Sequence, residues 1–295
     1  MDFKQIEAFV NVVRYKSFSK AADASFFTQP TISTHIQNLE KELGVKLLNR
    51  KSRTVEMTAQ GSTFYKFAVE MINSRARAIE AITKSSDTVE GILEIQTSSI
   101  PGVTFLPDFL SEFKKNNEMI QYYVSLSDSQ TVVENIIDRR GEIGFIGERI
   151  NSSTLESHLV SCDKSVLISP KSYGLDKTVS LEEMFKQPFI WRETGSATRR
   201  NFEECADKIG LDRNEIRFAA LVDDLDAVIR TVEAGLGVSI ISEKVAQALG
   251  DRVSISEIKD FDDSRSFYMI YMKNSSLSPA AAAFARFVKS KSPQN

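Results

Sequence analysis

Hydrophobic and polar positions follow a helical spacing across residues 28–43. The apolar positions are separated by four, three and four residues, and they are Ile32, Ile36, Leu39 and Leu43. This spacing predicts a helix with one buried stripe. Thr28 is a suitable N-cap, Pro30 falls in the first turn, and Gly44 can end the helix. The opposite face is polar and short, and it carries Gln29, Thr31, Ser33, Thr34 and Gln37.

The polar face of this predicted helix suits contact with DNA. Amide and hydroxyl groups hydrogen-bond base edges and phosphates without adding bulk or charge. An ordinary amphipathic helix is the simpler alternative, because the same pattern serves both structures. The residues on either side favour the DNA-binding interpretation.

Two shorter helices are predicted before residue 28. The first has apolar positions at Phe3, Ile6, Phe9, Val10 and Val13. The second is predicted to begin at a cap on Ser19 and to include Ala21, Ala22 and Phe26. Small residues at positions 21 and 22 allow helices to cross closely. A turn at Phe27 and Thr28 then presents the next helix outward, as in a helix-turn-helix.

A basic hairpin is predicted after Gly44. Residues 45–48 and 55–57 are rich in apolar positions and predict two short strands. The tip between them carries Arg50, Lys51 and Arg53. Such a wing can reach backbone phosphates and an adjacent minor groove. A solvated basic loop is the alternative.

These segments, in this order, resemble the LysR-type transcriptional regulators. The resemblance rests on the runs FSKAA (18–22), TQPTIS (28–33), LEKELG (39–44), LLNR (47–50) and RTVEMTAQG (53–61). It implies a winged helix-turn-helix whose major-groove residues are Gln29, Pro30, Thr31, Ser33, Thr34 and Gln37. Arg50 and Arg53 are implied to touch the wing-side backbone or minor groove. The family often has Arg where this chain has Thr34, which weakens the case for a guanine contact there.

Residues 59–88 continue as one long helical pattern. Its apolar positions are Phe64, Phe67, Ala68, Met71, Ile72, Ala78, Ile79 and Ile82. We find no partner for this stripe in the small N-terminal unit, so a second copy of the chain is the predicted partner. In the resembling family this segment is the dimerising linker helix, which would place two recognition helices on two half-sites. An internal core helix is the alternative, because Arg75 interrupts the pattern.

Strands and helices alternate from Gly91 onward, which is typical of an α/β fold. The predicted strands are 92–97, 120–126, 143–146, 189–192, 217–222, 238–242 and 266–273, and the predicted helices are 103–115, 130–139, 197–210, 225–234 and 279–289. Two lobes joined by crossing strands resemble a periplasmic solute-binding protein, which is the effector domain of the LysR family. The predicted domains are 1–58 (winged helix-turn-helix), 59–88 (linker helix) and 91–295 (effector domain, lobe I 91–163 plus 266–295, lobe II 164–265).

Three loops that follow predicted strands are rich in hydroxyl groups and glycine. Ligands of open α/β sheets bind at this edge, where helix N-termini offer N–H groups to anions. The candidate effector-binding residues are Ser98, Ser99, Gly147, Thr194 and Ser196. We expect a small carboxylate or inorganic oxyanion between the lobes, and a sulfur or selenium oxyanion is one hypothesis. The alternative is that these side chains only cap helices.

Composition and charge agree with a multidomain DNA-binding protein. The chain has 295 residues, of which 42% are hydrophobic, enough for two or three packed domains. Its net charge is −3, yet residues 1–90 carry 13 Lys and Arg against 10 Asp and Glu. The basic excess therefore lies on the segment expected to meet phosphates. Charged residues among the first fifteen argue against a signal peptide, and we expect a cytoplasmic protein with no membrane partner.

Few residues are available for metal or nucleophilic chemistry. The histidines are His35 and His158, the cysteines are Cys162 and Cys205, and neither pair has metal-ligand spacing. No nucleophile-elbow, Walker or dinucleotide motif occurs in the sequence. We therefore expect no enzyme activity, no catalytic residue, no metal and no cofactor. A reversible disulfide between the two cysteines is an alternative use for them.

Taken together, these patterns predict a LysR-like transcriptional regulator controlled by a small effector. Its expected partners are double-stranded DNA with a pseudo-palindromic operator, a small anionic effector, further copies of itself in a homodimer or homotetramer, and RNA polymerase. The main alternative is a small-molecule binding protein whose N-terminal helices serve assembly only. A third alternative, an enzyme that uses the cleft, lacks a nucleophile with a neighbouring base.

Overall fold

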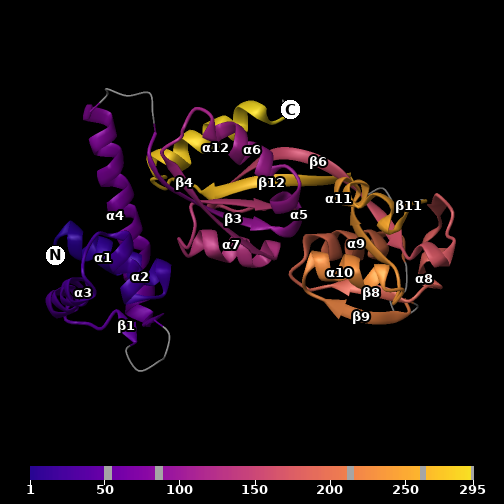
Figure 1. The fold of residues 1–295 in the computed structure, drawn as a ribbon, viewed down its shortest axis with the longest axis horizontal. Helices are drawn as coiled ribbons and strands as arrows, with labels where there is room; N and C mark the ends of the chain where they lie inside the picture. Colours follow the sequence, from indigo (N-terminus) through magenta and orange to yellow (C-terminus); the bar gives the residue numbers. More distant parts are fainter. Residues whose placement is uncertain (50–54, 84–88, 211–215, 260–263, 294–295) are drawn as a thin grey trace.

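The protein has three parts in a row: a small helical N-terminal domain, a central α/β lobe and a distal α/β lobe (Figure 1). This computed structural model describes residues 1–49, 55–83, 89–210, 216–259 and 264–293. One long helix rises from the N-terminal domain beside the central lobe (Figure 1). We call the central lobe, which carries the last helix, lobe I, and the distal one lobe II.

Three helices build the N-terminal domain, and they are α1 (Phe3–Tyr15), α2 (Phe18–Ala24) and α3 (Gln29–Leu43). Their facing sides share one core, whose fully buried members include Phe9, Ala21, Ile32, Ile36 and Leu39. Thr28 caps α3, and Gly44 ends it in the left-handed region at φ 69°, as the sequence predicts.

Two expectations for the second helix are wrong. Its N-cap is Ser17, whose hydroxyl accepts the Lys20 N–H, and not Ser19. Phe26 does not extend the helix: it lies in the turn at φ 55° with its side chain 98% exposed. The chain must reverse before α3, and the turn directs Phe26 outward while Phe27 packs against the core.

The two strands expected after α3 are present as β1 (Leu48–Asn49) and β2 (Glu56–Met57). They pair antiparallel, with Leu48 opposite Met57. The basic tip predicted between them, which includes Arg50, Lys51 and Arg53, lies outside the described residues.

Glu40 connects α3 to this hairpin. Its side chain is 1% exposed, and Oε1 accepts the backbone N–H groups of Leu47 at 2.9 Å and Leu48 at 3.3 Å. Oε2 accepts Lys46 Nζ at 2.8 Å. Burial favours the neutral acid, but these hydrogen bonds together outweigh it and lower the pKa of the Glu40 carboxyl below its usual value. The Glu40 side chain therefore fixes the position of the hairpin relative to α3, the predicted recognition helix.

The long helix α4 (Ala59–Thr83) has two apolar faces. The sequence pattern predicts a second copy of the chain as the partner of its whole apolar stripe, and this prediction is wrong for one face. That face packs against the core of its own N-terminal domain through Phe64, Tyr65, Ala68, Val69, Met71 and Ile72. The other face is exposed, with exposed fractions of 59% for Phe67, 44% for Ile79 and 82% for Ile82. On this second face, Phe67 and Ile82 are not buried by the described residues.

Lobe I is built on strands in the order β4-β3-β5-β12-β6. The first three run parallel, whereas β12 is antiparallel to β5 and β6. Helix α7 covers one face of this sheet, and α6 and α12 cover the other (Figure 1). The bounds are β3 (Gly91–Ser98), α5 (Ser99–Val103), α6 (Leu106–Lys114), β4 (Ile120–Ser127), α7 (Ser129–Ile137), β5 (Ile143–Ile146), β6 (Leu155–Ser169), β12 (Ser264–Met272) and α12 (Pro279–Lys291).

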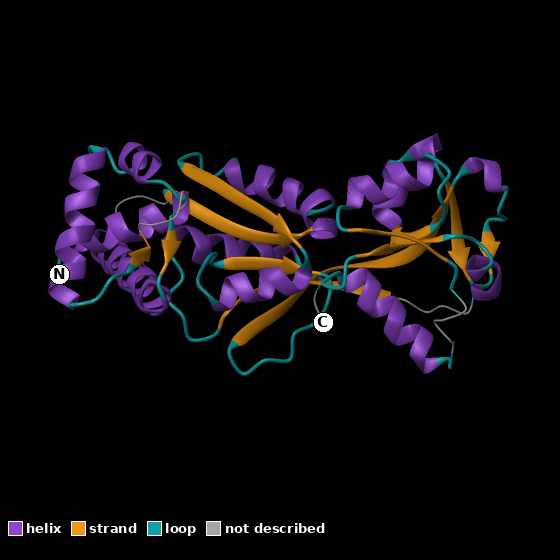
Figure 2. Ribbon diagram, turned by 90° about the horizontal axis from the view of Figure 1, so that it is seen from below, coloured by secondary structure: helices purple, strands orange, loops and turns teal. Residues whose placement is uncertain are grey.

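Lobe II is joined to lobe I by β6, which runs through both lobes, and by β12, which returns the chain (Figure 2). β6 pairs with β12 as far as Lys164, and beyond that point it pairs with β10 and β11. The bounds are η1 (Lys171–Tyr173), β7 (Thr178–Val179), α8 (Leu181–Phe185), β8 (Phe189–Arg192), α9 (Ala197–Lys208), β9 (Phe218–Val222), α10 (Leu225–Glu233), β10 (Ser239–Ser242), α11 (Glu243–Ala248), η3 (Gly250–Arg252) and β11 (Ser254–Ile258). The patterns in the sequence did not predict β6, β7, α8, α11 or β11.

Replacing Glu40 tests its role between α3 and the wing. Glu40→Ala leaves two buried N–H groups without their acceptor, so we expect a loss of about 1–3 kcal/mol in the free energy of unfolding at neutral pH. The pKa of Glu40 is lowered by folding, so its contribution is present above the unfolded value of 4.5 and is lost as the pH falls through the lower folded value. Urea unfolding at about pH 7 and about pH 3 measures both effects.

The matched control is Glu42→Ala on the same helix, because the Glu42 side chain is 52% exposed. It should change the unfolding free energy by no more than about 0.5 kcal/mol. Equal losses for the two variants at neutral pH would contradict the role of Glu40.

Candidate DNA-binding face and effector cleft

The polar side of α3 is not covered by the described part of the chain. Ile32 and Ile36, on its apolar side, are fully buried. Of the residues predicted to contact DNA, Thr31 and Ser33 are half-buried, and the exposed ones are Gln29, Pro30, Thr34 and Gln37. The structure therefore brings these six together on one accessible face, while Arg50 and Arg53 lie outside the described residues.

Two hydroxyl groups on this face are already engaged within the helix. Thr34 Oγ1 donates to the carbonyl of Pro30 at 2.9 Å. Thr31 Oγ1 lies 2.8 Å from Thr28 Oγ1, so the two share a hydrogen bond. This local bonding leaves the Thr34 hydroxyl to act outward as an acceptor only. The amides of Gln29 and Gln37 offer both donors and acceptors.

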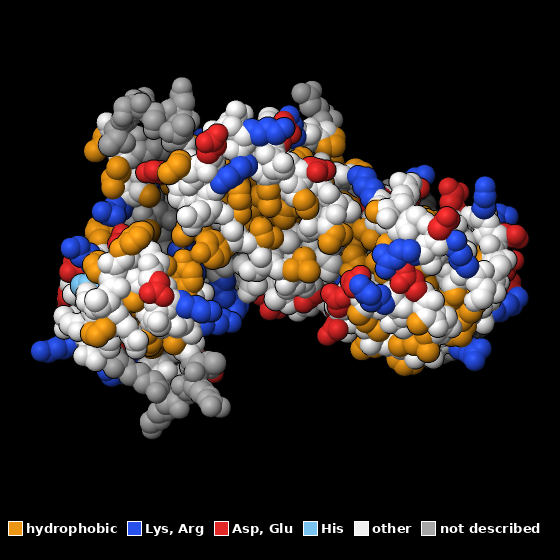
Figure 3. All heavy atoms as spheres, viewed as in Figure 1, with side chains coloured by type: hydrophobic (Ala, Val, Ile, Leu, Met, Phe, Trp, Pro, Cys, Tyr) orange, Lys and Arg blue, Asp and Glu red, His pale blue; other side chains and the backbone are white. Residues whose placement is uncertain are grey.

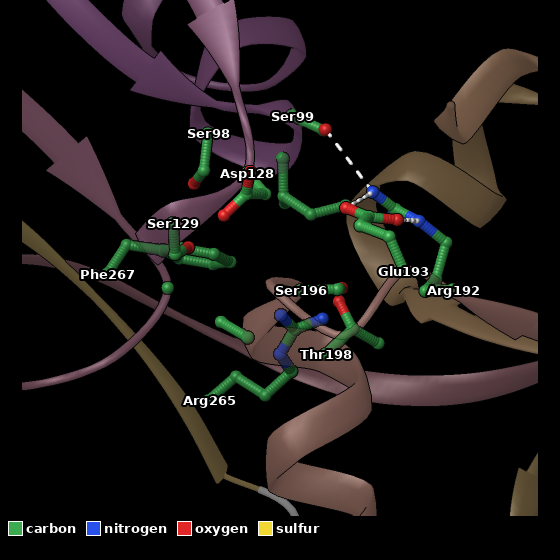
Figure 4. A pocket seen from close by; sticks show the side chains of 13 residues that line it. Ser98, Ser99, Asp128, Ser129, Arg192, Glu193, Ser196, Thr198, Arg265 and Phe267 are labelled. Atoms are coloured by element: carbon green, nitrogen blue, oxygen red, sulfur yellow. Dashed lines mark hydrogen bonds and ion pairs between the residues drawn. The ribbon is translucent and has the colours of Figure 1, made fainter. Parts of the chain in front are cut away.

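A polar cavity lies where the two lobes meet (Figure 4). It is lined from lobe I by Ser98, Ser99, Ile100, Asp128, Ser129 and Gly147, from lobe II by Arg192, Glu193, Ser196, Ala197 and Thr198, and from β12 by Arg265 and Phe267. Four of the five predicted effector-binding residues, Ser98, Ser99, Gly147 and Ser196, are among them. The predicted loops therefore converge on one site.

Thr194 is the exception, and its predicted place in the cavity is corrected. The Ser196 N–H donates to the Glu193 carbonyl at 3.0 Å and closes a turn. Thr194 lies in the middle of this turn, where its side chain is exposed and does not line the cavity. Its carbonyl accepts Arg200 Nη1 at 3.4 Å.

The alternative that the serines only cap helices is not supported by the geometry. Ser98 and Ser196 occupy the N-cap positions of α5 and α9, but neither side chain makes a capping hydrogen bond. Both residues are buried, at 7% and 4% exposure. Their hydroxyl groups line the cavity and can serve a ligand.

Two buried arginines that sequence reasoning missed also line the cavity. Arg192 ends β8 and is 5% exposed. Its Nη2 donates to Ser99 Oγ across the cleft at 3.4 Å, and its Nε and Nη2 each donate to the Glu193 carboxylate at 2.8 Å. Arg265 on β12 is 1% exposed, and its guanidinium lies 5.6 Å from the centre of the Phe267 ring. Arg192 could have been predicted as a cleft residue, because it is a charged residue at the end of an otherwise apolar strand.

The two lobes approach each other closely around this cavity. A Cβ atom added to Gly195 of lobe II would overlap the Asp128 carboxylate of lobe I, so a larger residue there would force Asp128 to shift. Arg200 of α9 pairs with Glu148 of lobe I. The remaining cavity has a volume of about 20 Å³. Such a space holds about one water molecule, so the cleft is closed.

A second set of contacts joins the N-terminal domain to lobe I. Arg14 of α1 donates through Nη2 to Glu94 Oε2 of β3 at 2.9 Å, and the rings of Tyr15 and Tyr123 meet edge to face at 6.1 Å. Burial opposes the charge on Arg14, but the neighbouring Glu94 carboxylate raises its pKa above the usual value. Beside these contacts a hollow of about 830 Å³ separates the two domains (Figure 3).

Helix α4 also contacts lobe I through polar side chains. Lys66 Nζ pairs with Asp138 Oδ1 at 2.9 Å, and Glu70 pairs with Arg139. Further along, Asn73 Nδ2 donates to Glu142 Oε1 and to the Ser276 carbonyl, each at 2.9 Å.

The same elements of lobe I that line the cavity also touch the DNA-binding half. Strand β3 ends at Ser98 in the cavity and carries Glu94, the partner of Arg14. Helix α7 is capped by Asp128 in the cavity, and Asp138, which follows its last turn, meets α4. Two rigid elements thus connect the cleft with the N-terminal half.

Within the described ranges, no cluster of three or more His, Cys, Asp or Glu side chains could hold a metal ion. No helix among them is long and apolar enough to cross a membrane.

A winged helix-turn-helix, a long linking helix and a two-lobed domain with a polar cleft define the class of effector-responsive DNA-binding regulators. Comparison with known sequences agrees: residues 3–62 match the model of the bacterial regulatory helix-turn-helix protein, lysR family, and residues 86–293 match the LysR substrate binding domain. The chain belongs to the family of LysR-type transcriptional regulators.

Individual relatives cover nearly the whole chain. An uncharacterized HTH-type transcriptional regulator, MJ0300, of Methanocaldococcus jannaschii is 29% identical over 96% of this chain and 96% of its own length. A full-length OxyR variant from Pseudomonas aeruginosa has a TM-score of 0.76 at 14% identity, covering 99% of this chain and 97% of its own. CbnR in complex with its target DNA has a TM-score of 0.66 at 22% identity, covering 99% and 100%. These likenesses confirm the predicted fold.

Proposed function

We propose that a small anionic effector binds between the lobes and alters how the two recognition helices of a dimer engage their operator. The observation that carries this proposal is the double role of β3 and α7, which both line the cleft and contact the N-terminal half. A ligand in the cleft lies next to Ser98 at the end of β3 and Asp128 at the start of α7. Glu94 and Asp138 then transmit the change to α1 and α4.

We assign base and phosphate contacts to the exposed face of α3. Gln29, Ser33 and Gln37 offer donors and acceptors to base edges, while Pro30, Thr31 and Thr34 shape the approach. Arg50 and Arg53 are proposed to contact the backbone or the adjacent minor groove, as the resemblance implies. The bare polar face also argues against the alternative in which these helices serve assembly only.

The DNA assignment is tested with two variants of different expected character. Ser33→Ala should lower discrimination between operator and mismatched sites by about 1–3 kcal/mol, because a base contact is lost. Arg53→Gln should weaken binding to all sequences alike and reduce the salt slope by about 1 per contact. Mobility-shift titrations with the promoter region next to the gene, at several salt concentrations, measure both.

Lys208→Gln, at the far end of α9 in lobe II, is the control for a lost positive charge and should change neither property. Full discrimination by Ser33→Ala would refute the assigned groove face. A sequence-dependent loss in Arg53→Gln would refute its assignment to the backbone.

We assign the effector to the cleft because its lining suits an anion. Hydroxyl groups that do not cap their helices, two buried guanidinium groups and the start of α9 all face one small cavity. Oxyanions and carboxylates accept such hydrogen bonds. The small volume favours a compact ligand, and a sulfur or selenium oxyanion remains our hypothesis.

Removing the two non-capping hydroxyls tests this assignment. The double substitution Ser98→Ala and Ser196→Ala should weaken binding of sulfate, phosphate or acetate at least about a hundredfold, because each of the two lost hydrogen bonds to a charged group contributes about 1.5–3 kcal/mol. Calorimetric titration of the full chain measures the affinities. Thr194→Ala, in the same loop but outside the cavity, is the control. If the wild type and the double variant bind every anion with the same affinity, these serines are not part of the site.

We further propose that the exposed face of α4, with Phe67, Ile79 and Ile82, packs against a second copy. Phe218 and Leu221 on β9 form a further exposed apolar patch, at 64% and 57% exposure, on the outer side of lobe II (Figure 3). A homodimer or homotetramer would cover such faces and present two recognition helices.

We expect the protein to work in the cytoplasm with DNA, to bind rather than transform its effector, and to have RNA polymerase as a further partner.

A further inference from the structure

The guanidinium of Arg192 is bound by a carboxylate of the chain itself. Glu193 follows Arg192 directly, and its two oxygens accept Nε and Nη2 at 2.8 Å each. This two-pronged arrangement is how a guanidinium holds a carboxylate or an oxyanion ligand. Both side chains line the cleft, and Figure 4 shows Glu193 lying alongside the Arg192 guanidinium.

Arg192 is held in place by groups other than Glu193. Its Nη2 reaches Ser99 Oγ at 3.4 Å, and its carbonyl accepts Arg199 Nη1 at 3.1 Å. The Arg192 side chain is 5% exposed, so burial also restrains it. The Arg199 contact holds the backbone of Arg192, while Ser99 and burial hold the guanidinium at the wall of the cleft when its carboxylate partner changes.

Glu193 has fewer constraints. Its side chain is 18% exposed, and among the described residues its carboxylate has no recorded hydrogen bond except those from Arg192. Rotation of this side chain toward solvent breaks one ion pair and no other recorded contact. The cavity of about 20 Å³ cannot admit a sulfate or a carboxylate beside Glu193 as it stands. An anion that reaches Arg192 must therefore displace a neighbour, and Glu193 is the neighbour whose negative charge it can replace.

We propose that Glu193 is a built-in competitor whose carboxylate takes the place on Arg192 that the anionic group of the effector occupies in the bound state. This inference rests on the proposed effector cleft and adds how the cleft selects its ligand. A neutral molecule cannot replace the carboxylate, because it would leave the buried Arg192 charge without a counter-charge. The ligand class is therefore a carboxylate or a tetrahedral oxyanion.

Competition by Glu193 sets a minimum affinity that an anion must have to bind at Arg192. A tethered side chain acts at an effective concentration in the millimolar range or above, so a simple anion in solution competes poorly. An effector that also bonds Ser98 and Ser196 on the other walls gains enough to displace Glu193. The common cellular anions, which make fewer of these contacts, bind more weakly.

Calorimetric titration of the full-length protein with sulfate, phosphate and acetate, at constant ionic strength set with chloride, tests the proposal. Glu193→Gln keeps the shape but removes the competing charge, and it should bind at least one of these anions about tenfold tighter than the wild type. Glu193→Ala should change the affinity in the same direction, which protects the test if one variant folds poorly. Adding Arg192→Lys to Glu193→Gln should remove the gain, because Lys cannot make the two-pronged contact.

Glu203→Gln is the matched control. Glu203 accepts Arg199 Nε at 2.8 Å on α9, outside the cavity lining, so its loss changes the local charge equally without touching Arg192. It should leave the anion affinities within about twofold of the wild type. Unchanged affinities in both Glu193 variants, or an equal gain in Glu203→Gln, would overturn the proposal.

Failure of this proposal is distinguishable from failure of the effector cleft itself. If the Ser98→Ala and Ser196→Ala protein loses anion binding while the Glu193 variants gain none, the cleft stands and Glu193 is not a competitor. If none of these substitutions changes anion binding, both proposals fall.

Discussion

The partly buried ion pair between Arg14 and Glu94 is the contact on which the position of the DNA-binding domain against lobe I depends. It joins the first helix of the DNA-binding domain to the first strand of the effector domain, at 2.9 Å between Nη2 and Oε2. The two side chains are 24% and 15% exposed, so either charge alone would be poorly solvated. The α1 helix and β3 are therefore constrained to move together. Weaker surface pairs, such as Lys66 with Asp138, add orientation more than stability.

The closed cleft between the lobes lies at the other end of β3 from the Arg14 contact. Gly195 lets the lobe II turn approach the Asp128 cap of α7, and Arg192 reaches Ser99 at the start of α5. Because so little space is left, a ligand cannot bind without changing how the two lobes pack. Packed interfaces move between discrete arrangements, so such a change is not gradual. A ligand that displaces Glu193 changes the charge at this junction and shifts the population of lobe arrangements. The strand that senses the cleft is also the strand that holds Arg14.

Local signals in the sequence were sufficient for much of this structure. The stripe of α3, its Thr28 cap and the Gly44 end predicted the recognition helix, and the hydroxyl-rich loops after strands predicted four lining residues of the cleft. Sequence could not reveal how Thr194 points, because the Glu193–Ser196 turn decides that. It also missed β6, whose polar positions at Cys162, Asp163 and Lys164 interrupt the apolar pattern. Arg265 was missed because only tertiary packing brings β12 to the cleft.

The most direct test of the coupling between cleft and DNA is the sulfate affinity of the protein with and without its promoter DNA, measured by calorimetry at constant ionic strength. Coupling is reciprocal, so DNA binding must change the anion affinity in the wild type. In the double variant Arg14→Gln and Glu94→Gln, which removes both charges of the pair, we expect that change to become smaller, because only the connection through α7 and Asp138 remains. The same anion affinity for free and DNA-bound wild type, or an undiminished change in the double variant, would contradict coupling through α1 and β3.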